Sequence, residues 1–422
     1  MTGRAAALRR PGSARDGAAS VLAELAGRLL GTSLPVRLRA WDGSEAGPAS
    51  GPVVIIRSRT ALRQMLWRPG ELGLARAYVT GGLDVDGDLT EGLRALWRAV
   101  GPLRGQRARL GPAGWLAAGR AAVALRIAGP PPPAPAAEVR ISGRVHSRRR
   151  DQQVISAHYD LPPAFYQLIL DPAMAYSCAW WTSDEASYTL ADAQRDKLDM
   201  ICRKMRLRPG SRLLDIGCGW GSLAIHAARD YGARVTAVTL AGEQAAFVRD
   251  RARAVGLADL VAVETRDYRD IGSREYDAVA SIEMGEHVGQ RAYPAFCAQL
   301  RDLLRPDGRL LIQQMSRGAR APGGGAFISA YVATDMHMRP VGETVALLEQ
   351  AGLRVEDVQA MPAHYARTIR AWLGRLEEAH GEVTALIGEE QARVWRLYLA
   401  GGALAFEDGR MGVHQIAATR PQ

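Results

Sequence analysis

The sequence predicts an α/β protein in which a Rossmann-like, seven-stranded sheet with helical insertions follows a smaller N-terminal α+β domain. Three observations support this prediction. At 422 residues the chain is longer than one hydrophobic core normally supports, so at least two structural units are expected. A proline-rich run, GPPPPAPAAE, spans residues 129–138 and favours an extended connector over a helix. Beyond it, short apolar segments alternate with helix-like segments, as in a parallel sheet covered by helices.

These features divide the chain into a basic domain over residues 1–128, a linker over 129–150 and a second domain over 151–422. Within the first domain, a helix is expected at 21–30, a strand at 52–57 and a turn at 81–88. The segment 111–129 is apolar with two interleaved arginines. It fits either a helix lying on a membrane surface or a helix packed on its own domain.

In the second domain, the expected strands are 212–216, 234–239, 260–264, 277–282, 309–314, 353–358 and 413–419. Helices are expected near 221–231, 242–255, 290–304 and 342–351. Two stretches, 316–340 and 362–408, interrupt this alternation. Because ligands of open α/β sheets bind outside the carboxyl ends of the strands, we expect these insertions to form walls of the substrate site.

The net charge of +10 is concentrated in the first third of the chain. Residues 1–150 contain 24 arginines and 10 acidic residues, whereas the remaining 272 residues contain 30 basic and 34 acidic residues. Such a basic region attracts nucleic acid or an anionic membrane, and charge alone does not choose between them.

Other features exclude several classes of protein. The sequence has no uninterrupted apolar run of about 18 residues, so a membrane-spanning helix is not expected. The first residues lack the apolar stretch of a secretory signal. The four cysteines have no metal-ligand spacing, so no metal is expected and a reduced, cytoplasmic compartment is the default.

The segment Leu213-Leu-Asp-Ile-Gly-Cys-Gly-Trp-Gly221 predicts a ligand-binding turn between a strand and a helix. Gly217 and Gly219 allow the backbone to bend tightly and to approach a ligand closely. Asp215, at the end of the strand, can organise the loop or reach polar groups of the ligand. A dinucleotide-binding fold usually has an acidic residue at the end of its second strand, but this chain has Val238-Thr239-Leu240 there. The DxGxGxG form is similar instead to S-adenosylmethionine-dependent methyltransferases.

From His158 onward, the chain resembles the cyclopropane-fatty-acid synthase and mycolic-acid methyltransferase family. The matching strings include AHYDLPPAFYQLILDPAMAYSCAWW (157–181), LLDIGCGWGSLAIHAA (213–228), SIEMGEHVG (281–289) and HYARTIRAW (364–372). The resemblance implies S-adenosylmethionine as cofactor and methyl transfer to a cis double bond of a phospholipid acyl chain. The reaction would pass through a carbocation, which then loses a proton.

The resemblance also implies three sets of site residues. The cofactor is expected to contact Tyr176, Ser177, Asp215, Gly217, Gly219, Thr239, Leu240, Gln244, Asp267, Tyr268 and Ile282. A substrate tunnel is expected to be lined by side chains that keep it dry and stabilise positive charge, namely His158, Tyr159, Phe165, Tyr166, Trp180 and Trp181. Proton abstraction is expected to involve Cys178, Glu286, His287, Gln313 and Tyr365, several of which match residues that hold a bicarbonate ion as general base in relatives.

The chain departs from the family in three places. Gln313 stands at the position of a histidine, and its amide cannot carry a proton. Residues 331–340 differ from the corresponding segment of cyclopropane synthases. Glu283 stands where the family usually has glycine, and a second carboxylate near Glu286 can create a base poised near neutrality, although a solvated or salt-bridged Glu283 is the commoner outcome. The strings QQMSR (313–317) and DMHMRP (335–340) resemble the actinobacterial subgroup that makes 10-methylene fatty acids, precursors of tuberculostearic acid.

These departures favour a 10-methylene product, with cyclopropane as the alternative. A nucleic-acid-binding methyltransferase is an alternative from another class, opposed by the lack of an RNA-binding motif and by an aromatic content of only 6%. A non-catalytic lipid-binding scaffold is a third. The expected partners are phospholipid acyl chains at the inner face of the membrane, a flavin- or nicotinamide-dependent reductase acting on the methylene product, and a second copy of the chain in a homodimer; nucleic acid is not expected.

Overall fold

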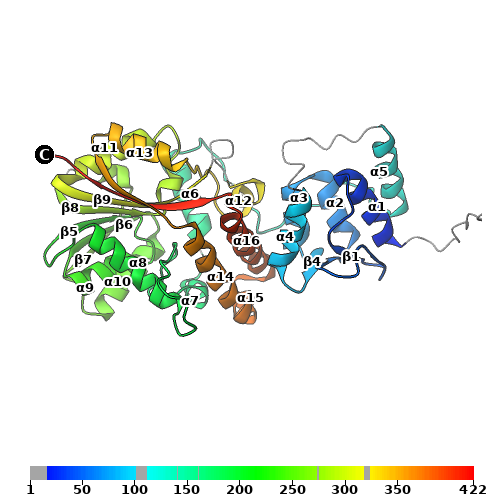
Figure 1. Ribbon diagram of the computed structural model, residues 1–422, viewed down its shortest axis with the longest axis horizontal. Coiled ribbons are helices and arrows are strands. Elements are labelled where there is room, and N and C mark those ends of the chain that lie inside the picture. Colours follow the sequence, from blue (N-terminus) through cyan, green and yellow to red (C-terminus); the bar gives the residue numbers. More distant parts are fainter. Residues whose placement is uncertain (1–16, 101–111, 140, 160, 273–274, 318–323) are drawn as a thin grey trace, which may run out of the picture. The chain divides into compact units, whose positions relative to one another are not determined.

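The computed structural model describes residues 17–100, 112–139, 141–159, 161–272, 275–317 and 324–422 (Figure 1). The chain divides into two compact units, Met1–Pro135 and Ala136–Gln422. This division lies inside the region predicted as a linker. Helix α6 (Arg148–Tyr159) belongs to the second unit and begins before the predicted end of the linker.

The first unit contains a four-stranded sheet with the order β2-β1-β3-β4. Its strands are β1 (Arg37–Ala40), β2 (Glu45–Ala46), β3 (Val53–Ile56) and β4 (Leu83–Asp86). The described helices of this unit are α1 (Ala18–Leu30), α2 (Arg59–Trp67), α3 (Glu71–Val79), α4 (Leu89–Val100) and α5 (Pro112–Ala124). A core of aliphatic side chains, including Leu38, Ile56 and Leu62, joins helices and sheet. The unit is α+β, as predicted.

Strand β4 replaces the turn that was predicted at 81–88, so that prediction was wrong. Val85 pairs with Val54 of β3 in antiparallel register. Leucine and valine alternate with aspartate along β4, which is the two-residue period of a strand. The glycines that suggested a turn flank the strand instead of interrupting it.

The apolar segment after residue 111 packs on its own unit. Leu125 and Ile127 are buried in the core of the first unit, and Arg59 Nε donates a hydrogen bond to Leu125 O at 3.0 Å. Val123 of α5 nevertheless stays 75% exposed. The segment therefore packs on its domain and also presents apolar surface outward.

The second unit is built on a seven-stranded sheet with the order β10-β11-β9-β8-β5-β6-β7. The seven predicted strands are confirmed as β5 (Arg212–Ile216), β6 (Arg234–Thr239), β7 (Val261–Thr265), β8 (Tyr276–Ile282), β9 (Leu304–Ser316), β10 (Arg354–Ala360) and β11 (Gly412–Thr419). Strands β5 to β9 run parallel, whereas β11 is antiparallel to both β9 and β10. The C-terminal strand thus inserts between β9 and β10 and makes the sheet mixed.

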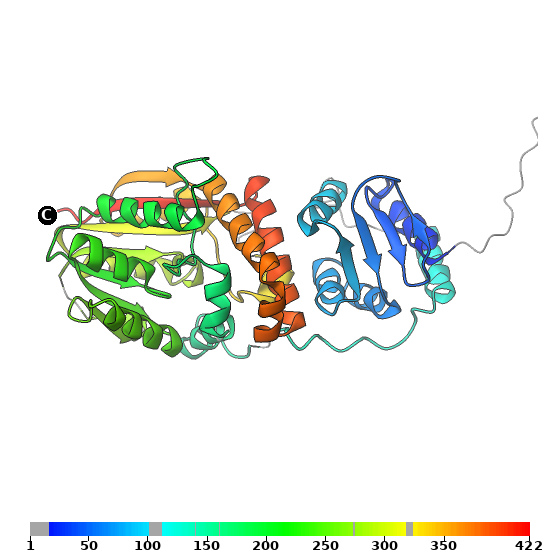
Figure 2. The ribbon, with the colours of Figure 1, turned by 90° about the horizontal axis from the view of Figure 1, so that it is seen from below.

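Helices cover both faces of this sheet (Figures 1 and 2). Leu213 of β5 belongs to a core shared with α8 (Leu190–Lys204), α9 (Ser222–Tyr231) and α10 (Gly242–Ala254). The next residue, Leu214, belongs to a core shared with α11 (Tyr293–Leu303) and α13 (Val341–Gln350). Successive side chains of a strand point to opposite faces, so the apolar run of β5 supports two helical layers.

The insertions add a helical layer at one end of the sheet. The second insertion forms α14 (Pro362–Glu378), α15 (His380–Ile387) and α16 (Glu389–Glu407), which share an aromatic-rich core with α7 (Pro163–Ile169). The first insertion contains α12 (Ala326–Tyr331). The aromatic-rich core includes Trp220 of the glycine loop and Val413 of β11. The helical layer therefore meets the sheet at the end where the glycine loop lies.

Candidate active site

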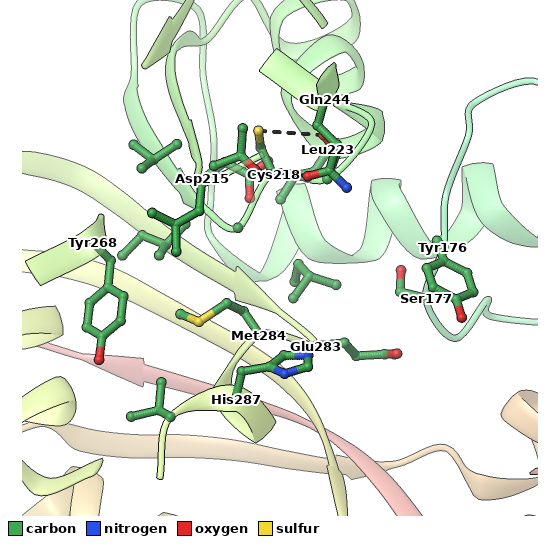
Figure 3. A pocket seen from close by; sticks show the side chains of 18 of the residues that line it. Tyr176, Ser177, Asp215, Cys218, Leu223, Gln244, Tyr268, Glu283, Met284 and His287 are labelled. Atoms are coloured by element: carbon green, nitrogen blue, oxygen red, sulfur yellow. Dashed lines mark hydrogen bonds between the residues drawn. The ribbon is translucent and has the colours of Figure 1, made fainter. Parts of the chain in front are cut away.

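A cavity lies at the carboxyl ends of β5, β6 and β8 (Figure 3). The glycine loop, the residues following these strands, and parts of α8 and of the segment before it form its walls. Eleven of the predicted site residues line the cavity: Tyr176, Ser177, Asp215, Gly217, Gly219, Thr239, Leu240, Gln244, Tyr268, Ile282 and His287. The sheet thus brings together side chains that are more than one hundred residues apart in the sequence.

The glycine loop requires glycine at Gly217 for two reasons. Its φ of +78° lies in the left-handed region, which side chains with a Cβ rarely adopt. A Cβ at this position would also lie 2.8 Å from Met284 Cγ, which is too close. At Gly219, φ is +50° and the space around a Cβ is open, so the backbone there is accessible to a ligand.

Three buried polar atoms of cavity-lining residues have no protein partner among the described residues: Trp220 Nε1 and two atoms that are candidate ligand contacts. One is Asp215 Oδ2, on a carboxyl group whose pKa is raised to about 7 by burial and lowered in part by Lys197. The other is Gln244 Nε2. Thr239 Oγ1 donates to Gln244 Oε1 at 2.9 Å, which turns the amide so that its NH₂ group stays free to donate. The cavity therefore offers an acceptor for a ligand amine and a donor for a ligand hydroxyl.

Asp267 differs from its neighbour Tyr268. The Tyr268 side chain lines the cavity, whereas Asp267 is absent from the lining in the described part of the chain. Arg269 Nε and Nη2 donate to the two carboxylate oxygens of Asp267 at 2.8 and 2.6 Å. The structure thus gives Asp267 an ion pair that holds the loop after β7, and Arg269 itself lines the cavity.

Lys197 lines the cavity and was not identified from the sequence. It lies on α8, is 1% exposed, and its Nζ donates to Ser177 Oγ at 2.9 Å. Burial lowers the pKa of Lys197, and the nearby carboxylates of Glu283 and Asp171 oppose this shift. Composition held a signal: Lys197 is one of only two lysines in a chain with 54 basic residues, so arginine was avoided at this position.

Glu283 is the centre of a hydrogen-bond network at the wall of the cavity. Its Oε1 accepts from the backbone N–H of Cys178 at 2.9 Å and from Gln313 Nε2 at 2.8 Å. Its Oε2 accepts from the Tyr365 hydroxyl at 2.5 Å. These three donors come from the chain segment before α8, from β9 and from α14, so three distant segments converge on one carboxylate.

Gln313 is held in one orientation by its neighbour across the sheet. Gln415 of β11 is paired with Gln313 of β9, and Gln415 Nε2 donates to Gln313 Oε1 at 2.9 Å. The Gln313 oxygen is thereby occupied, so its NH₂ group faces Glu283 and the Cys178 carbonyl oxygen. Both glutamine side chains are fully buried. Gln313 is therefore a fixed hydrogen-bond donor to Glu283.

Bicarbonate does not fit this arrangement. The resemblance to the family implied that Cys178, Gln313 and Tyr365 would bind the ion together with Glu286. The donors of the first three are bound to the Glu283 carboxylate instead. A second anion beside a buried carboxylate would face like-charge repulsion.

Glu286 does not line the cavity in the described part of the chain. Its Oε1 accepts from the backbone N–H of Met315 at 2.6 Å, and its Oε2 is buried without a described partner. Burial, reinforced by the nearby charge of Glu283, raises the pKa of Glu286 to about 8. Glu286 is therefore mostly protonated at neutral pH, and it binds the backbone near the end of β9.

His287 is partly buried and Cys178 is buried, and both are uncharged at neutral pH. Burial lowers the pKa of the His287 imidazole to about 4, so this cavity-lining ring is neutral at neutral pH. Burial raises the pKa of the Cys178 thiol well above its usual range, and the thiol contacts the carbonyl oxygen of Ala179. The backbone N–H of Cys178, and not its sulfur, faces Glu283.

The aromatic residues predicted to line a tunnel are packed elsewhere. Phe165 has no exposed surface and its ring centroid lies 4.8 Å from that of Trp395. Trp180 packs against His364, with centroids 4.0 Å apart, and Trp181 Nε1 donates to a threonine of α14. None of these three lines the cavity among the described residues, because each is held by its own core partners.

The remaining tunnel predictions have different outcomes. Tyr166 is also fully buried, with its ring centroid 5.0 Å from that of Trp220. The side chains of His158 and Tyr159, at the end of α6, lie outside the described residues. Tyr176, which was predicted to contact the cofactor, does line the cavity, and its ring is backed by Trp372 and Trp395 at centroid distances of 5.2 and 5.8 Å.

The described residues contain no cluster of histidine, cysteine, aspartate or glutamate that could hold a metal ion. The four cysteines are free and buried.

Comparisons with known proteins identify the family to which the chain is similar. Residues 146–416 match the family described as Mycolic acid cyclopropane synthetase. A "Probable fatty acid methyltransferase" of Pseudomonas putida is 37% identical over 413 residues, covering 95% of this chain and 96% of the relative. The "Tuberculostearic acid methyltransferase UfaA1" of Mycobacterium tuberculosis (strain ATCC 25618 / H37Rv) is 33% identical over 418 residues, covering 95% of this chain and 92% of the relative.

A solved structure shows the same fold. The crystal structure of mycolic acid cyclopropane synthase CmaA1 complexed with SAH and CTAB matches with a TM-score of 0.60 and 29% sequence identity. It covers 64% of this chain and 98% of that chain. The matched protein thus binds S-adenosylhomocysteine on this fold.

Proposed function

The chain belongs to the mycolic acid cyclopropane synthetase family of S-adenosylmethionine-dependent methyltransferases, and we propose that it methylates the cis double bond of an oleoyl-type phospholipid acyl chain. We propose further that the product is a 10-methylene acyl chain. The proposal rests on two features that line one cavity. One is the glycine loop with the unpartnered polar atoms of Asp215 and Gln244, and the other is the hydrogen-bond network around the Glu283 carboxylate.

The residues present fit the cofactor. S-adenosylmethionine, when bound, supplies an electrophilic methyl group on a sulfonium. Asp215 would accept hydrogen bonds from its ammonium group, and Gln244 would donate to a ribose hydroxyl. Gly217 and Gly219 allow close approach of the backbone, and the Tyr268 ring provides a flat wall for the adenine.

An alkene is a weak nucleophile, so the protein has to align it with the methyl donor and to exclude water. Apolar side chains, including Met174, Ile282 and Met284, line much of the cavity. The Tyr176 ring offers a π face that stabilises a developing cation. The positive charge on the acyl chain would thus form in a dry, electron-rich environment.

The choice of product depends on what happens to the cation. Loss of a proton from the new methyl group with ring closure gives cyclopropane. If a hydride first shifts away from the methylated carbon, the same proton loss gives an exocyclic methylene. The fixed amide of Gln313 supports the methylene product, because it stands where the family has a histidine. Similarity to UfaA1 over 95% of this chain also supports it.

We propose that the lipid is reached from the membrane surface. No helix in the described parts of the chain is long and apolar enough to cross a membrane. The arginine excess of residues 1–150 favours adsorption to anionic phospholipid at the inner face of the membrane. A reductase would then be the enzyme that consumes a methylene product.

Incubation of the purified chain with S-adenosylmethionine and vesicles of dioleoylphosphatidylglycerol tests the proposal. Gas chromatography and mass spectrometry of the fatty acid methyl esters should show a 10-methylene ester as the main new species. Vesicles with saturated acyl chains are the control and should give no product. A dominant cyclopropane ester would overturn the product assignment, and absence of any methylated ester would overturn the substrate assignment.

A further inference from the structure

Resting on the proposed function, we infer that Glu283 is the base that takes the proton from the lipid cation, with its own carboxylate in place of a bound anion. Glu283 immediately follows β8 and lines the cavity together with Tyr176 and Ser177 (Figure 3). The base would thus be part of the chain, and the reaction would not depend on bicarbonate.

Glu283 occupies an unfavourable backbone conformation for a residue with a side chain. Its φ is +52°, in the left-handed region that favours glycine. Strain of this kind persists where the surrounding structure enforces it, and it occurs frequently at active sites. A glutamate is thus held in a backbone conformation that suits glycine better.

The hydrogen bonds of Glu283 leave room for a proton. Oε1 accepts two hydrogen bonds, from Cys178 and Gln313, whereas Oε2 accepts one, from Tyr365. A carboxylate has about four acceptor positions, so Oε2 keeps one lone pair for a further partner. The hydrogen bonds to Oε1 and Oε2 orient the carboxylate. The remaining lone pair is on Oε2, and Glu283 lines the cavity.

The other titratable groups at the cavity are less suited to this role. Lys197 donates a hydrogen bond to Ser177, and Asp215 lies at the end of β5, where it fits the cofactor ammonium. Glu286 is outside the lining of the described cavity and binds the Met315 backbone. The imidazole of His287 is a weak base because burial lowers its pKa to about 4.

The electrostatic environment of Glu283 supports its role as a base. Burial raises the pKa of Glu283 above its usual range, which makes it a stronger base than a carboxylate in water. The hydrogen bonds from Tyr365, Cys178 and Gln313, together with the charge of Lys197, act in the opposite direction and favour the ionised form. The positive charge of the bound cofactor would act in the same sense as Lys197.

The step balances without a further reactant. The π electron pair of the alkene forms a bond to the methyl carbon, and the electron pair of the broken carbon–sulfur bond stays on sulfur. A hydride then moves, with its electron pair, from the methylated carbon to the cationic carbon. A C–H bond of the new methyl group breaks, its electron pair forms the exocyclic double bond, and Glu283 Oε2 receives the proton. The proton returns to solvent after the products leave.

Two substitutions separate a base from a merely structural group. Glu283→Gln keeps the shape but cannot take the proton, and Glu283→Gly relieves the backbone while it frees the donors of Cys178, Gln313 and Tyr365. Glu349→Gln, at an exposed position of α13, is the matched control. Turnover is measured on dioleoylphosphatidylglycerol vesicles in buffer stripped of carbon dioxide, with and without added sodium bicarbonate.

The wild-type protein and Glu349→Gln should have equal turnover in both buffers. The turnover of Glu283→Gln should be at least 100-fold lower than that of the wild-type protein in both buffers, which is the size of effect expected for loss of a general base. Glu283→Gly should show a similar loss without bicarbonate and should recover at least tenfold when it is added. Wild-type turnover that requires bicarbonate, or an active Glu283→Gln, would overturn the inference and leave the proposed function intact.

A binding measurement tests the same inference without turnover. Sodium bicarbonate is titrated calorimetrically into each protein saturated with S-adenosylhomocysteine. Binding is expected for Glu283→Gly and not for the wild-type protein, while both should bind S-adenosylhomocysteine equally. Bicarbonate binding by the wild-type protein would overturn the inference. A wild-type protein that methylates no lipid, with this binding pattern unchanged, would instead overturn the proposed function.

Discussion

Replacing Glu283 by glycine and by alanine measures the backbone strain that this position carries. Both substitutions remove the same three hydrogen bonds, so they differ only in the Cβ atom. At a φ of +52°, a residue with a Cβ pays a conformational penalty of about 1–2 kcal/mol. The larger conformational freedom of glycine in the unfolded chain offsets about 0.4–1 kcal/mol of this difference. We therefore expect Glu283→Gly to be the more stable variant by about 1 kcal/mol.

Equilibrium unfolding in urea, followed by tryptophan fluorescence, provides the measurement. The midpoint of the transition should be higher for Glu283→Gly than for Glu283→Ala, with equal slopes. The same pair of substitutions at Glu349, in the helix α13, is the control and should show the opposite order, because glycine is the poorer helix former. If Glu283→Ala were as stable as Glu283→Gly, the left-handed conformation of Glu283 would be refuted.

Further predictions concern the rest of the site. Asp215→Asn should weaken S-adenosylhomocysteine binding about tenfold, or about 1.4 kcal/mol. Because burial raises the pKa of Asp215 to about 7, the affinity of the wild-type protein for S-adenosylhomocysteine, measured by calorimetry, should rise from pH 6 to pH 8. An affinity that does not change with pH would contradict this. Gln415→Leu should release Gln313 and lower turnover about tenfold with unchanged cofactor affinity. Gln313→His should raise the cyclopropane fraction in the methyl ester profile, and an unchanged profile would assign product control to residues 331–340. Because burial raises the pKa of Glu286 to about 8, the folded state binds an extra proton between its unfolded value and pH 8, so the unfolding free energy should fall as pH rises through that window. Glu286→Gln should gain about 4 kcal/mol relative to wild type between pH 5 and pH 9 in urea titrations, and a constant difference would refute the shift.

The sheet of the second unit could be predicted because its strands are short apolar runs between polar or glycine-rich turns. The same rule failed at β4, where alternating aspartates and flanking glycines hid a strand that pairs with β3. The backbone groups of that strand are satisfied by a partner some thirty residues away, and no local signal encodes this pairing.

The cofactor cradle could be predicted because glycine spacing and a strand end are local features. The carboxylate network could not, because it depends on a contact between β8 and three distant segments. Glu283 was recognised as unusual, but its bonds to Cys178 and Tyr365 exist only in the fold. Sequence alone left open whether Phe165 and Trp180 line a tunnel or fill a core, because an aromatic side chain suits both; in the structure they pack in or against a core.

The fate of a labelled methyl group tests the central claim, methyl transfer followed by a hydride shift and then by loss of a proton from the new methyl group. Dioleoylphosphatidylglycerol is incubated with S-adenosylmethionine that carries a trideuterated methyl group, and the methyl esters are examined by mass spectrometry and proton NMR. The account predicts a new ester that retains two of the three deuterium atoms on an exocyclic methylene carbon. An ester that retains all three deuterium atoms, or an ester in which the two remaining deuterium atoms lie on a cyclopropane ring, would contradict it.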